Sequence, residues 1–471
     1  MSDSAPAHGD SPSSAGAQSS GQRSLTEREA AHLTAPAHVG ESDKLKETVD
    51  RIALSARRIS RQLGRASATQ RAQVIKEIAQ LLIRRQDEVL AANHIDLDRA
   101  EHAALSEAMI DRLRLTPERL SKLSESLEEI AAAPDLIGEV SRQWDRPNGL
   151  SVSKMRLPLG VIMIIYESRP NVTMDAAALC LKSGNAVILR GGSEAQESNR
   201  ALFSLIQRAL VTVGLPIASA QLLPTQDRKA IDLLLQKSEE IDLVIPRGGP
   251  NLIRRVTAQS RIPVVRHDEG ICHLYIDRYA DLDQAFEITL NAKVQRPGVC
   301  NAIETLLVDA EVAHEFLPRV TRALREAGVT LRLDERAFTL CAQEGHSQMS
   351  QWPKIYIATE RDWATEFLSL ELAVRIVSGV GEAIEHIDRY GSRHTASIIT
   401  QDEDSALRFV REVDASCVLV NASTRFNDGG ELGLGAEVGI STTRIHAYGP
   451  MGVESLTAEK FVVRGEGHVR A

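Results

Sequence analysis

The feature that most constrains the fold is a series of uninterrupted apolar segments that alternates with helical segments after Gly149. Residues 160–166 read GVIMIIY and residues 185–192 read NAVILRGG, and the helical stretch DAAALCLKSG lies between them. Strands that lack polar alternation are typical of parallel sheets with both faces covered by helices. The pattern therefore predicts a β-α-β unit whose helix ends at Gly184.

The same alternation continues over residues 221–266, with strands predicted at QLLPT, IDLVIPRGG and IPVVR and helices at RKAIDLLLQ and NLIRRVTAQ. Ahead of this sheet, apolar residues recur at three- and four-residue steps, which predicts a helix through Val74, Ile75, Ile78, Leu81 and Leu82. Thr116 before Pro117 predicts another helix start, because threonine can cap the first turn and proline suits the first helical position. The predicted fold class is α/β.

Composition excludes several classes of function. The 471 residues are 43% hydrophobic, enough for two or three domains with their own cores. A formal net charge of -9 argues against a nucleic-acid partner. Because no apolar run approaches the roughly 18 residues of a membrane span, and no signal peptide is evident, we expect a cytoplasmic protein without a membrane partner. Residues 1–40, rich in Ser, Ala, Gly and Pro, are predicted to be a disordered tail.

Two turns at predicted strand ends carry the sequence Arg-Gly-Gly. The residues concerned are Arg190, Gly191, Gly192 and Ser193 in the first and Arg247, Gly248 and Gly249 in the second. Main-chain N–H groups at a helix start favour an anion, and a cation at the same offset in both copies favours a nucleotide phosphate. The alternative is that the glycines only turn the chain. Neither copy is the G-x-G-x-x-G motif of ordinary dinucleotide folds.

The five cysteines differ in their surroundings. A packed core thiol is favoured for Cys180, Cys272, Cys341 and Cys417. Cys300, in VQRPGVCN, instead follows a Pro-Gly turn, and Lys293 and Arg296 precede it. Since the thiolate is the reactive form and nearby cations lower a thiol's pKa, this setting favours a nucleophile. Without a C-x-x-C pair, neither a disulfide framework nor a metal site is expected.

Four long blocks of the sequence resemble a known family. In chain order they are PLGVIMIIYESRPNVTMDAAALCLKSGNAVILRGGSEA, KVQRPGVCNAIETLLV, VNASTRF and ELGLGAEVGISTTRIHAYGPMGVESL. They are similar to the glutamate-5-semialdehyde dehydrogenases, also called γ-glutamyl phosphate reductases, of the aldehyde dehydrogenase superfamily. The resemblance implies that Cys300 is the nucleophile in an NADPH-dependent reduction of γ-glutamyl phosphate to glutamate 5-semialdehyde and phosphate. The reaction would pass through a cysteine thioester and form the second step of proline biosynthesis from glutamate.

The resemblance also implies further site residues. An oxyanion needs hydrogen-bond donors, for which the main-chain N–H of Cys300 and the side-chain amide of Asn171 are the first candidates. Because the substrate carries a phosphate and a carboxylate, arginines and polar groups in the matched blocks are expected to bind it, namely Arg169, Arg296, Asn301, Ser423 and Arg425. Asn301 is also the second candidate for the oxyanion donor. The alternatives are ion pairs inside the domain for the arginines and a turn for the serine.

Cofactor choice follows from the first Arg-Gly-Gly turn. Superfamily members that prefer NAD carry a K-P-A-E-like motif whose carboxylate binds the adenosine ribose. Here Arg190 stands at the lysine position and Ser193 at the carboxylate position. A guanidinium without that carboxylate suits a 2′-phosphate, so NADP(H) is the expected cofactor. A shift of one residue would bring the carboxylate of Glu194 into the ribose site.

One departure from the hydrolytic members of the superfamily concerns the base that activates water. They carry a glutamate upstream of the cysteine, and the corresponding position here is His267. Glu269 stands two residues away, so a shifted alignment would restore a carboxylate. If neither points at Cys300, thioester hydrolysis lacks its base, which suits a reductase.

The implied architecture is aldehyde dehydrogenase-like, with a Rossmann-type nucleotide domain, an α/β catalytic domain and a small β oligomerisation element. The predicted segments are the disordered tail (1–40), the N-terminal helical part of the nucleotide domain (41–149), an oligomerisation strand (150–157), the NADP-binding domain (158–268), the catalytic domain (269–449) and a C-terminal oligomerisation segment (450–471). The strand and the C-terminal segment would pair and reach another subunit, which implies a homo-oligomer. A transient contact with glutamate 5-kinase, which makes the labile acyl phosphate, is left open.

Two other functions stay open at this point. One is another activity of the superfamily, on a free aldehyde or an acyl-CoA. The other is a binding scaffold without catalysis, against which Cys300 and both Arg-Gly-Gly turns argue.

Overall fold

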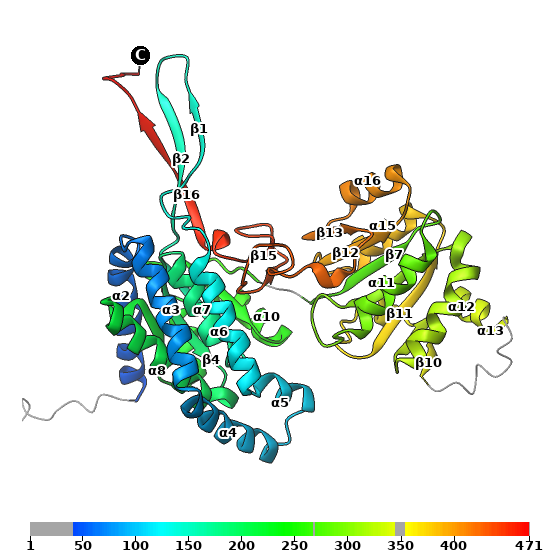
Figure 1. The fold of residues 1–471 in the computed structure, drawn as a ribbon, viewed down its shortest axis with the longest axis horizontal. Coiled ribbons are helices and arrows are strands. Elements are labelled where there is room, and N and C mark those ends of the chain that lie inside the picture. The colour runs from blue at the N-terminus through cyan, green and yellow to red at the C-terminus, as the bar shows by residue number, and fades with distance from the viewer. Residues whose placement is uncertain (1–40, 267–268, 344–353, 471) are drawn as a thin grey trace, which may run out of the picture. The chain divides into compact units, whose positions relative to one another are not determined.

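The structure is a computed structural model that describes residues 41–266, 269–343 and 354–470 (Figure 1). The predicted tail, residues 1–40, and the position of His267 lie outside the described residues. The described residues fall into two compact units, the second of which begins at Lys46. That second unit contains two parallel sheets, and we call the elements packed on each of them the first and the second lobe.

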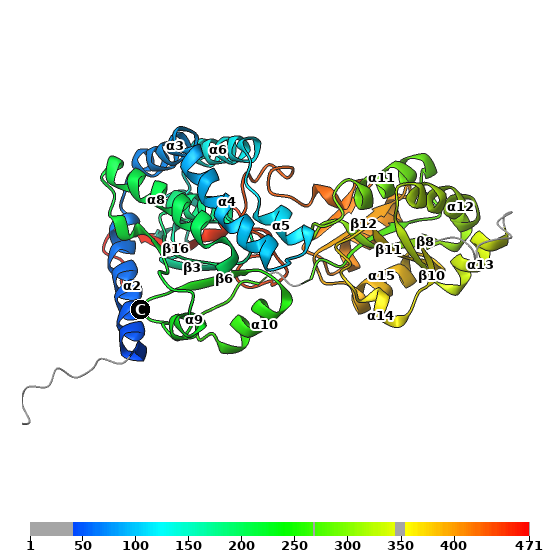
Figure 2. The same cartoon turned by 90° about the horizontal axis from the view of Figure 1, so that it is seen from below.

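The first lobe is built on a four-stranded parallel sheet of order β5-β4-β3-β6. Its strands are β3 (Val161–Tyr166), β4 (Ala186–Gly191), β5 (Ala220–Leu222) and β6 (Leu243–Arg247). Its helices are α2 (Glu41–Leu63), α3 (Ala68–Arg84), α4 (Gln86–His102), α5 (Glu107–Leu113), α6 (Pro117–Ala132), α7 (Val172–Lys182), α8 (Gln196–Val213), α9 (Arg228–Leu234) and α10 (Pro250–Gln259). Figure 2 shows α3, α6 and α8 on one face of this sheet and α9 and α10 on the other. Covering both faces buries every residue of β3 and β4, as their apolar runs predict.

Local signals set the ends of several helices. The side chain of Thr116 accepts a hydrogen bond from the N–H of Arg119 and Pro117 occupies the first turn of α6, which confirms the predicted start. Gly184, with φ of +74°, follows α7 in the left-handed conformation that ends many helices. The apolar positions predicted for α3 face the core. Four of them are buried, namely Val74, Ile75, Ile78 and Leu82.

One predicted strand is wrong. IPVVR, residues 262–266, forms no strand, and Val264 makes only an isolated parallel bridge with Val244. The carbonyl of Pro263 accepts from the N–H of Val244, and the N–H of Val265 donates to the carbonyl of Val244. Proline offers no N–H of its own, so the ladder does not extend toward the start of the segment.

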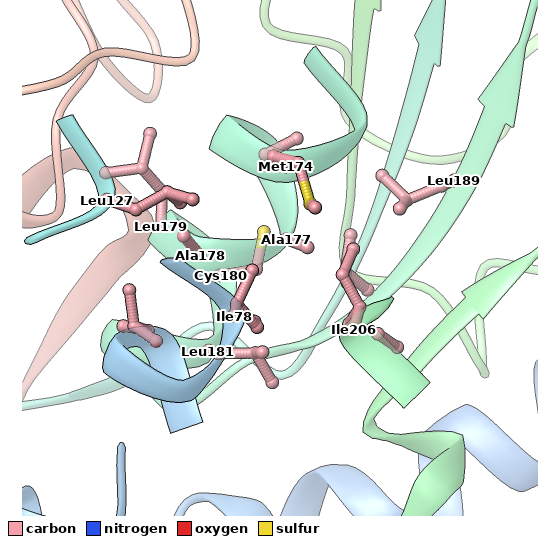
Figure 3. Close-up of a cluster of buried hydrophobic side chains, with 14 of the residues drawn as sticks. Ile78, Leu127, Met174, Ala177, Ala178, Leu179, Cys180, Leu181, Leu189 and Ile206 are labelled. Atoms are coloured by element: carbon pink, nitrogen blue, oxygen red, sulfur yellow. The ribbon is translucent and has the colours of Figure 1, made fainter. Parts of the chain in front are cut away.

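Cys180 lies in the last turn of α7, inside the core of the first lobe. Figure 3 shows its sulfur among apolar side chains of α7 and α3, with Ile78 and Met174 nearby, and its exposed fraction is 0%. We therefore expect Cys180→Ala to leave a small cavity and to lower the free energy of unfolding by about 1–3 kcal/mol, with catalysis retained. Chemical denaturation and a steady-state assay of the same preparation measure both. A variant with unchanged stability, or with lost turnover, would contradict this placement.

The second lobe is built on a seven-stranded parallel sheet of order β10-β9-β11-β8-β7-β12-β13. Its strands are β7 (Cys272–Ile276), β8 (Ile303–Asp309), β9 (Thr330–Leu333), β10 (Ile355–Ile357), β11 (Glu371–Val377), β12 (Thr395–Ile399) and β13 (Cys417–Val420). Its helices are α11 (Leu282–Val294), α12 (Ala310–Glu326), α13 (Glu335–Gln343), α14 (Glu360–Trp363), α15 (Val380–Tyr390) and α16 (Glu403–Glu412). Figure 2 shows α11 and α12 on one face and α14 and α15 on the other. The two covered parallel sheets confirm the α/β class.

A three-stranded antiparallel sheet of order β1-β2-β16 joins distant parts of the sequence. Its strands are β1 (Val140–Asp145), β2 (Ser151–Pro158) and β16 (Thr457–Arg464), and a two-stranded ladder of β14 (Ile440–Ser441) and β15 (Gly449–Pro450) precedes the last of them. The predicted pairing of the segment after Gly149 with the C-terminal segment is therefore present within one chain. Phe461 is 65% exposed and Val463 55% exposed on this sheet.

The described residues show neither a membrane-spanning helix nor a metal site. None of the described helices is long and apolar enough to span a membrane. Among the same residues, no group of three or more His, Cys, Asp and Glu side chains is arranged to hold a metal ion.

Candidate active site

Cys300 lies in the loop between the end of α11 at Val294 and the start of β8 at Ile303. This loop is at the amino-terminal end of a central strand of the seven-stranded sheet. The side chain is half-buried. Of the other cysteines, those that are buried are Cys180, Cys272 and Cys341, and Cys417 is half-buried like Cys300.

The main chain of Cys300 is fixed by the residues that lead into β7. A Cβ on Gly270 would fall 2.2 Å from the carbonyl oxygen of Cys300 and 2.8 Å from its Cα, so the two backbones touch. The thiol of Cys272 donates to the same carbonyl oxygen at 3.0 Å. The N–H of Gly270 in turn donates to Glu366 at 2.8 Å. Any side chain at position 270 must therefore displace Cys300.

We expect Gly270→Ala to lower kcat by about 100-fold or more, because a shift of the nucleophile by around 1 Å is enough for such a loss. Gly381→Ala is the matched control, since a Cβ there meets only the end of the flexible Arg408 side chain, at 3.4 Å. Steady-state kinetics and circular dichroism of the two variants separate a misplaced nucleophile from a fold that has failed. Wild-type kcat in Gly270→Ala would disprove the tight contact.

Asn301 ties the nucleophile loop to the segment that contains Ser423 and Arg425. Its side-chain amide donates to the main-chain oxygens of Arg425 at 3.3 Å and of Asn427 at 3.0 Å. The hydroxyl of Thr424 donates back to the carbonyl of Asn301 at 2.7 Å. The Oγ of Ser423 accepts from the N–H of Arg425, so it caps a short helical turn. Direct contact of Asn301 or Ser423 with substrate stays a prediction, for which the hydroxyl proton of Ser423 and the Oδ1 of Asn301 are still available.

The electrostatic surroundings of Cys300 come mainly from distant parts of the sequence. Burial raises the pKa of the thiol to about 11, and the carboxylates of Glu366 and Glu437 act in the same direction. Arg247 and Arg169 act against them and lower it. The expectation of a lowered pKa was wrong for this structure, because removal from water outweighs the cations.

Lys293, one of the two cations expected to lower that pKa, is engaged elsewhere. Its Nζ lies 2.6 Å from Glu304 Oε2 and donates to the carbonyl of Ile303 at 2.9 Å. The side chains of Lys293 and Glu304 are 0% and 1% exposed. This buried ion pair supports the nucleophile loop instead of facing the thiol.

Arginines from separate segments come together around Cys300. Burial, together with the charges of Arg247, Arg112 and Arg296, lowers the pKa of Arg169 to about 10. The thiolate of Cys300 has the opposite effect on Arg169. Mutual repulsion in a desolvated cluster is typical of a site that awaits an anion.

Two more contacts link arginines to the nucleophile loop. Arg112, on α5, donates to the carbonyl of Gly298 at 3.4 Å, and Arg425 donates to the side chain of Gln295 at 2.9 Å. Sequence reasoning missed Arg112, because nothing in its local pattern distinguishes it from a solvated helix residue.

Asn171 begins the turn into α7. Its amide donates to Asp175 Oδ2 at 3.1 Å. Burial raises the pKa of Asp175 to about 7, and the hydrogen bond from Asn171 opposes that shift. The amide predicted to stabilise the oxyanion is thus oriented by a carboxyl group one turn further along.

Both Arg-Gly-Gly turns hold a carboxylate of the chain itself. The N–H of Gly249 donates to Glu167 Oε2 at 3.0 Å. At the other turn, a Cβ on Gly192 would fall 2.1 Å from Oε1 of Glu194, so this carboxyl group lies over the glycine. Glutamate side chains therefore lie at both turns in this structure, and binding of a nucleotide phosphate there stays a prediction.

The two arginines of these turns have different neighbours. Burial lowers the pKa of Arg190, while Glu194 and Glu167 oppose that shift. The buried Nε of Arg190 has no hydrogen-bond partner among the described residues. The guanidinium of Arg247 instead packs on Gly439, where a Cβ would lie 2.4 Å from Nη1.

A pocket of about 170 Å³ opens at the carboxyl end of β4, beside Gly191. Its walls are α8 residues and the segment 222–226, and they include the apolar Phe203 and Leu223 and the cation Arg200. Ligands of parallel sheets bind at this edge. Ser193, in the adjoining turn, is exposed.

Carboxylates near the nucleophile come from residues that sequence reasoning did not single out. Besides Glu437, Glu366 has a pKa raised by burial and, further, by Glu269. Glu269 therefore lies near Glu366, while His267 is outside the described residues. No motif surrounds Glu366, and Glu437 lies in the last of the four matched blocks but was not singled out within it.

Comparisons with known proteins agree on one family. The aldehyde dehydrogenase family matches residues 19–359. The gamma-glutamyl phosphate reductase of Anaeromyxobacter sp. is 52% identical over 430 residues, which cover 91% of this chain and 99% of that protein. The reductase of the same name from Desulfatibacillum aliphaticivorans is 52% identical over 89% of this chain and 98% of that protein.

Solved structures give the same result. The crystal structure of gamma-glutamyl phosphate reductase from Thermotoga maritima aligns with a TM-score of 0.85 and 43% identity, and covers 90% of this chain and 100% of that one. A glyceraldehyde-3-phosphate dehydrogenase from Methanocaldococcus jannaschii, solved with NADP, aligns with a TM-score of 0.63 and 16% identity over 89% of this chain and 95% of that one. The second likeness shows the fold alone.

Proposed function

The chain belongs to the aldehyde dehydrogenase family, and within it to the gamma-glutamyl phosphate reductases, and from this premise we propose that it reduces γ-glutamyl phosphate to glutamate 5-semialdehyde and phosphate with NADPH. In proline biosynthesis from glutamate this is the second step. The observation that carries the proposal is the 52% identity over 99% of a curated reductase. The half-buried Cys300, surrounded by arginines, supports it.

The covalent chemistry belongs to Cys300. Its thiolate attacks the acyl carbon, the bond from that carbon to the phosphate oxygen breaks, and phosphate leaves with the electron pair, so that a thioester remains. The main-chain N–H of Cys300 and the amide of Asn171 would stabilise the oxyanion. A bound NADPH supplies the hydride for reduction of the thioester. Breaking the carbon–sulfur bond then releases the aldehyde and returns the thiolate.

The arginines have two tasks in this proposal. Arg169 and Arg247 lower the pKa of Cys300 and would also accept the negative charge of the leaving phosphate. Arg296, in the same loop as Cys300, and Arg425, in the turn Thr424–Phe426, would bind the α-carboxylate.

The residues at the carboxyl edge of the first sheet fit a nicotinamide dinucleotide. The pocket beside Gly191 is apolar on one side and carries Arg200, which suits an adenosine with a phosphate. A pyrophosphate at the two turns would take the place that the carboxyl groups of Glu167 and Glu194 have in this structure. The carboxyl group of Glu194 accepts a hydrogen bond from Ser168, so it is engaged within the protein, which supports NADPH over NADH.

We expect Arg190→Ala and Ser193→Glu each to lower kcat/KM with NADPH more than with NADH. The difference should be about 1–3 kcal/mol in transition-state free energy. The first removes a guanidinium and the second restores a carboxylate that repels a 2′-phosphate. Steady-state kinetics with both cofactors measure the difference, and Arg200→Ala shows whether the pocket arginine shares the task. Equal losses with both cofactors in Arg190→Ala would remove that residue from the 2′-phosphate site.

The exposed apolar residues of the β1-β2-β16 sheet support a homo-oligomer. Both outer strands of this sheet have an unpaired edge, and Phe461 and Val463 are exposed on β16. Such edges are covered in stable proteins. We propose that a second copy covers this sheet, whereas the contact with glutamate 5-kinase stays a prediction.

The reverse reaction tests the proposed function most directly, because it avoids the labile acyl phosphate. Glutamate 5-semialdehyde with phosphate and NADP should give NADPH, and omission of phosphate should stop it. Reduction of NADP without phosphate would favour oxidation of a free aldehyde, and dependence on coenzyme A would favour an acyl-CoA reductase. If none of these reactions occurs, the remaining alternative is a binding scaffold without catalysis.

A further inference from the structure

The turn after β3 contains a residue in a strained backbone conformation. Ser168 has φ of +46°, in the left-handed region that side chains other than glycine rarely adopt. It is 7% exposed, so water does not hold it in place. A conformation of this kind persists only when the surrounding structure enforces it.

The enforcing group is the carboxylate of Glu194. Its Oε1 accepts hydrogen bonds from both the main-chain N–H and the hydroxyl of Ser168, the latter at 2.9 Å. Hydrogen bonds to an ionised carboxylate are stronger than those between neutral groups. Glu194 belongs to the short helical turn Ser193–Ala195 directly after β4, so the turn after one strand holds the turn after its neighbour.

The conformation of Ser168 matters because two candidate site residues come directly after it in the chain. The next residues are Arg169, Pro170 and Asn171. Proline fixes its own φ and restricts the backbone of the residue before it. The backbone conformation of Ser168 therefore largely determines where Arg169 and Asn171 are placed.

We propose that Glu194 is a positioning residue, which clamps Ser168 in the left-handed conformation and thereby directs Arg169 and Asn171 toward the acyl phosphate. This inference rests on the proposed function, in which those two residues bind the substrate and its oxyanion. The clamp also links the substrate site to the cofactor site, because Glu194 belongs to the turn that would bind NADPH.

The competing role for the same carboxylate is a hydrogen bond to the cofactor ribose. The two roles differ in what glycine at position 168 does. Glycine reaches positive φ without a Cβ penalty, so Ser168→Gly relieves the need for a clamp but cannot replace a ribose ligand.

The test compares Glu194→Ala, Ser168→Gly with Glu194→Ala, and the exposed control Glu128→Ala. Glu194→Ala should lower kcat/KM for the acyl phosphate by about 10- to 100-fold and leave the KM for NADPH within about twofold. The double variant should recover at least about fivefold of that loss, and Glu128→Ala should match wild type. A raised KM for NADPH without rescue would assign Glu194 to the cofactor and overturn the clamp.

Thermal unfolding of the same proteins distinguishes a failure of the clamp from a failure of the proposed function. If wild type shows no turnover of the acyl phosphate, the proposed function fails. The clamp is then decided by Tm alone, which Glu194→Ala should lower and Ser168→Gly should restore in the double variant. A Tm that stays low in the double variant would refute the clamp whatever the activity.

Discussion

Replacement of Cys300 by alanine should reduce turnover by at least about 10⁴-fold, since the sulfur forms the covalent bond on which every later step depends. The fold should survive, because Cys300 is half-buried in a loop whose position depends on main-chain contacts with Gly270 and Cys272. Circular dichroism and Tm near wild type, together with the lost activity, are the expected results.

Cys417→Ala is the matched control, because Cys417 is the other half-buried cysteine and lies on β13. It should keep activity near wild type. Iodoacetamide should inactivate wild type and Cys417→Ala alike, and bound NADPH should still be detectable by fluorescence in Cys300→Ala. Turnover of Cys300→Ala within tenfold of wild type would exclude a thioester at this residue.

Replacement of Lys293 by methionine should lower the free energy of unfolding by about 3–5 kcal/mol, the typical cost of breaking a buried ion pair. Lys293 and Glu304 are both buried and 2.6 Å apart, so the variant leaves a carboxylate without its cation. Activity should fall as well, because Lys293 also donates to Ile303 at the end of the nucleophile loop.

The pH dependence of that variant has a defined sign. Burial raises the pKa of Glu304 to about 7 even with Lys293 present, and loss of the cation raises it further. A carboxyl group whose pKa is higher in the folded than in the unfolded state stabilises folding at low pH and loses that contribution as the pH rises. The loss in the free energy of unfolding caused by Lys293→Met should therefore be smallest near pH 5 and grow above pH 7.

A second substitution distinguishes an unpaired charge from a packing defect. Glu304→Gln in the Lys293→Met background removes the charge, and the amide can still accept the N–H of Leu368, which lies 3.1 Å from Glu304 Oε1. Most of the lost stability should return in urea unfolding curves. If the double variant is as unstable as the single one, the pair does not act through its charge.

The sequence predicted those parts of the fold that depend on local pattern. Uninterrupted apolar runs indicated β3 and β4, and Thr116 with Pro117 indicated the start of α6, because each signal lies within a few residues of its effect. The strand predicted at residues 262–266 failed where Pro263 interrupts pairing with a neighbour that the local sequence does not reveal.

The surroundings of the candidate nucleophile were less predictable for the same reason. Cys300 stands out in its own loop, but the groups that act on its pKa are Arg247 at the end of β6, Arg169 after β3, and the carboxyl groups of Glu366 and Glu437. Gly270 has ordinary sequence neighbours, and its need for a bare Cα arises only from contact with a residue thirty positions later in the chain. Tertiary contacts of this kind leave no periodic or spacing signal.

The antiparallel pairing of β16 with β2 has a consequence for synthesis of the chain. Leu456 is fully buried in the core of the first lobe, and the side chain of Asn185 donates to its carbonyl at 2.8 Å. The first lobe therefore lacks part of its core until Leu456 has left the ribosome, whereas the core clusters of the second lobe lie between Leu274 and Val418. On the ribosome, the second lobe can therefore complete its core first, although the sheet of the first lobe is translated earlier.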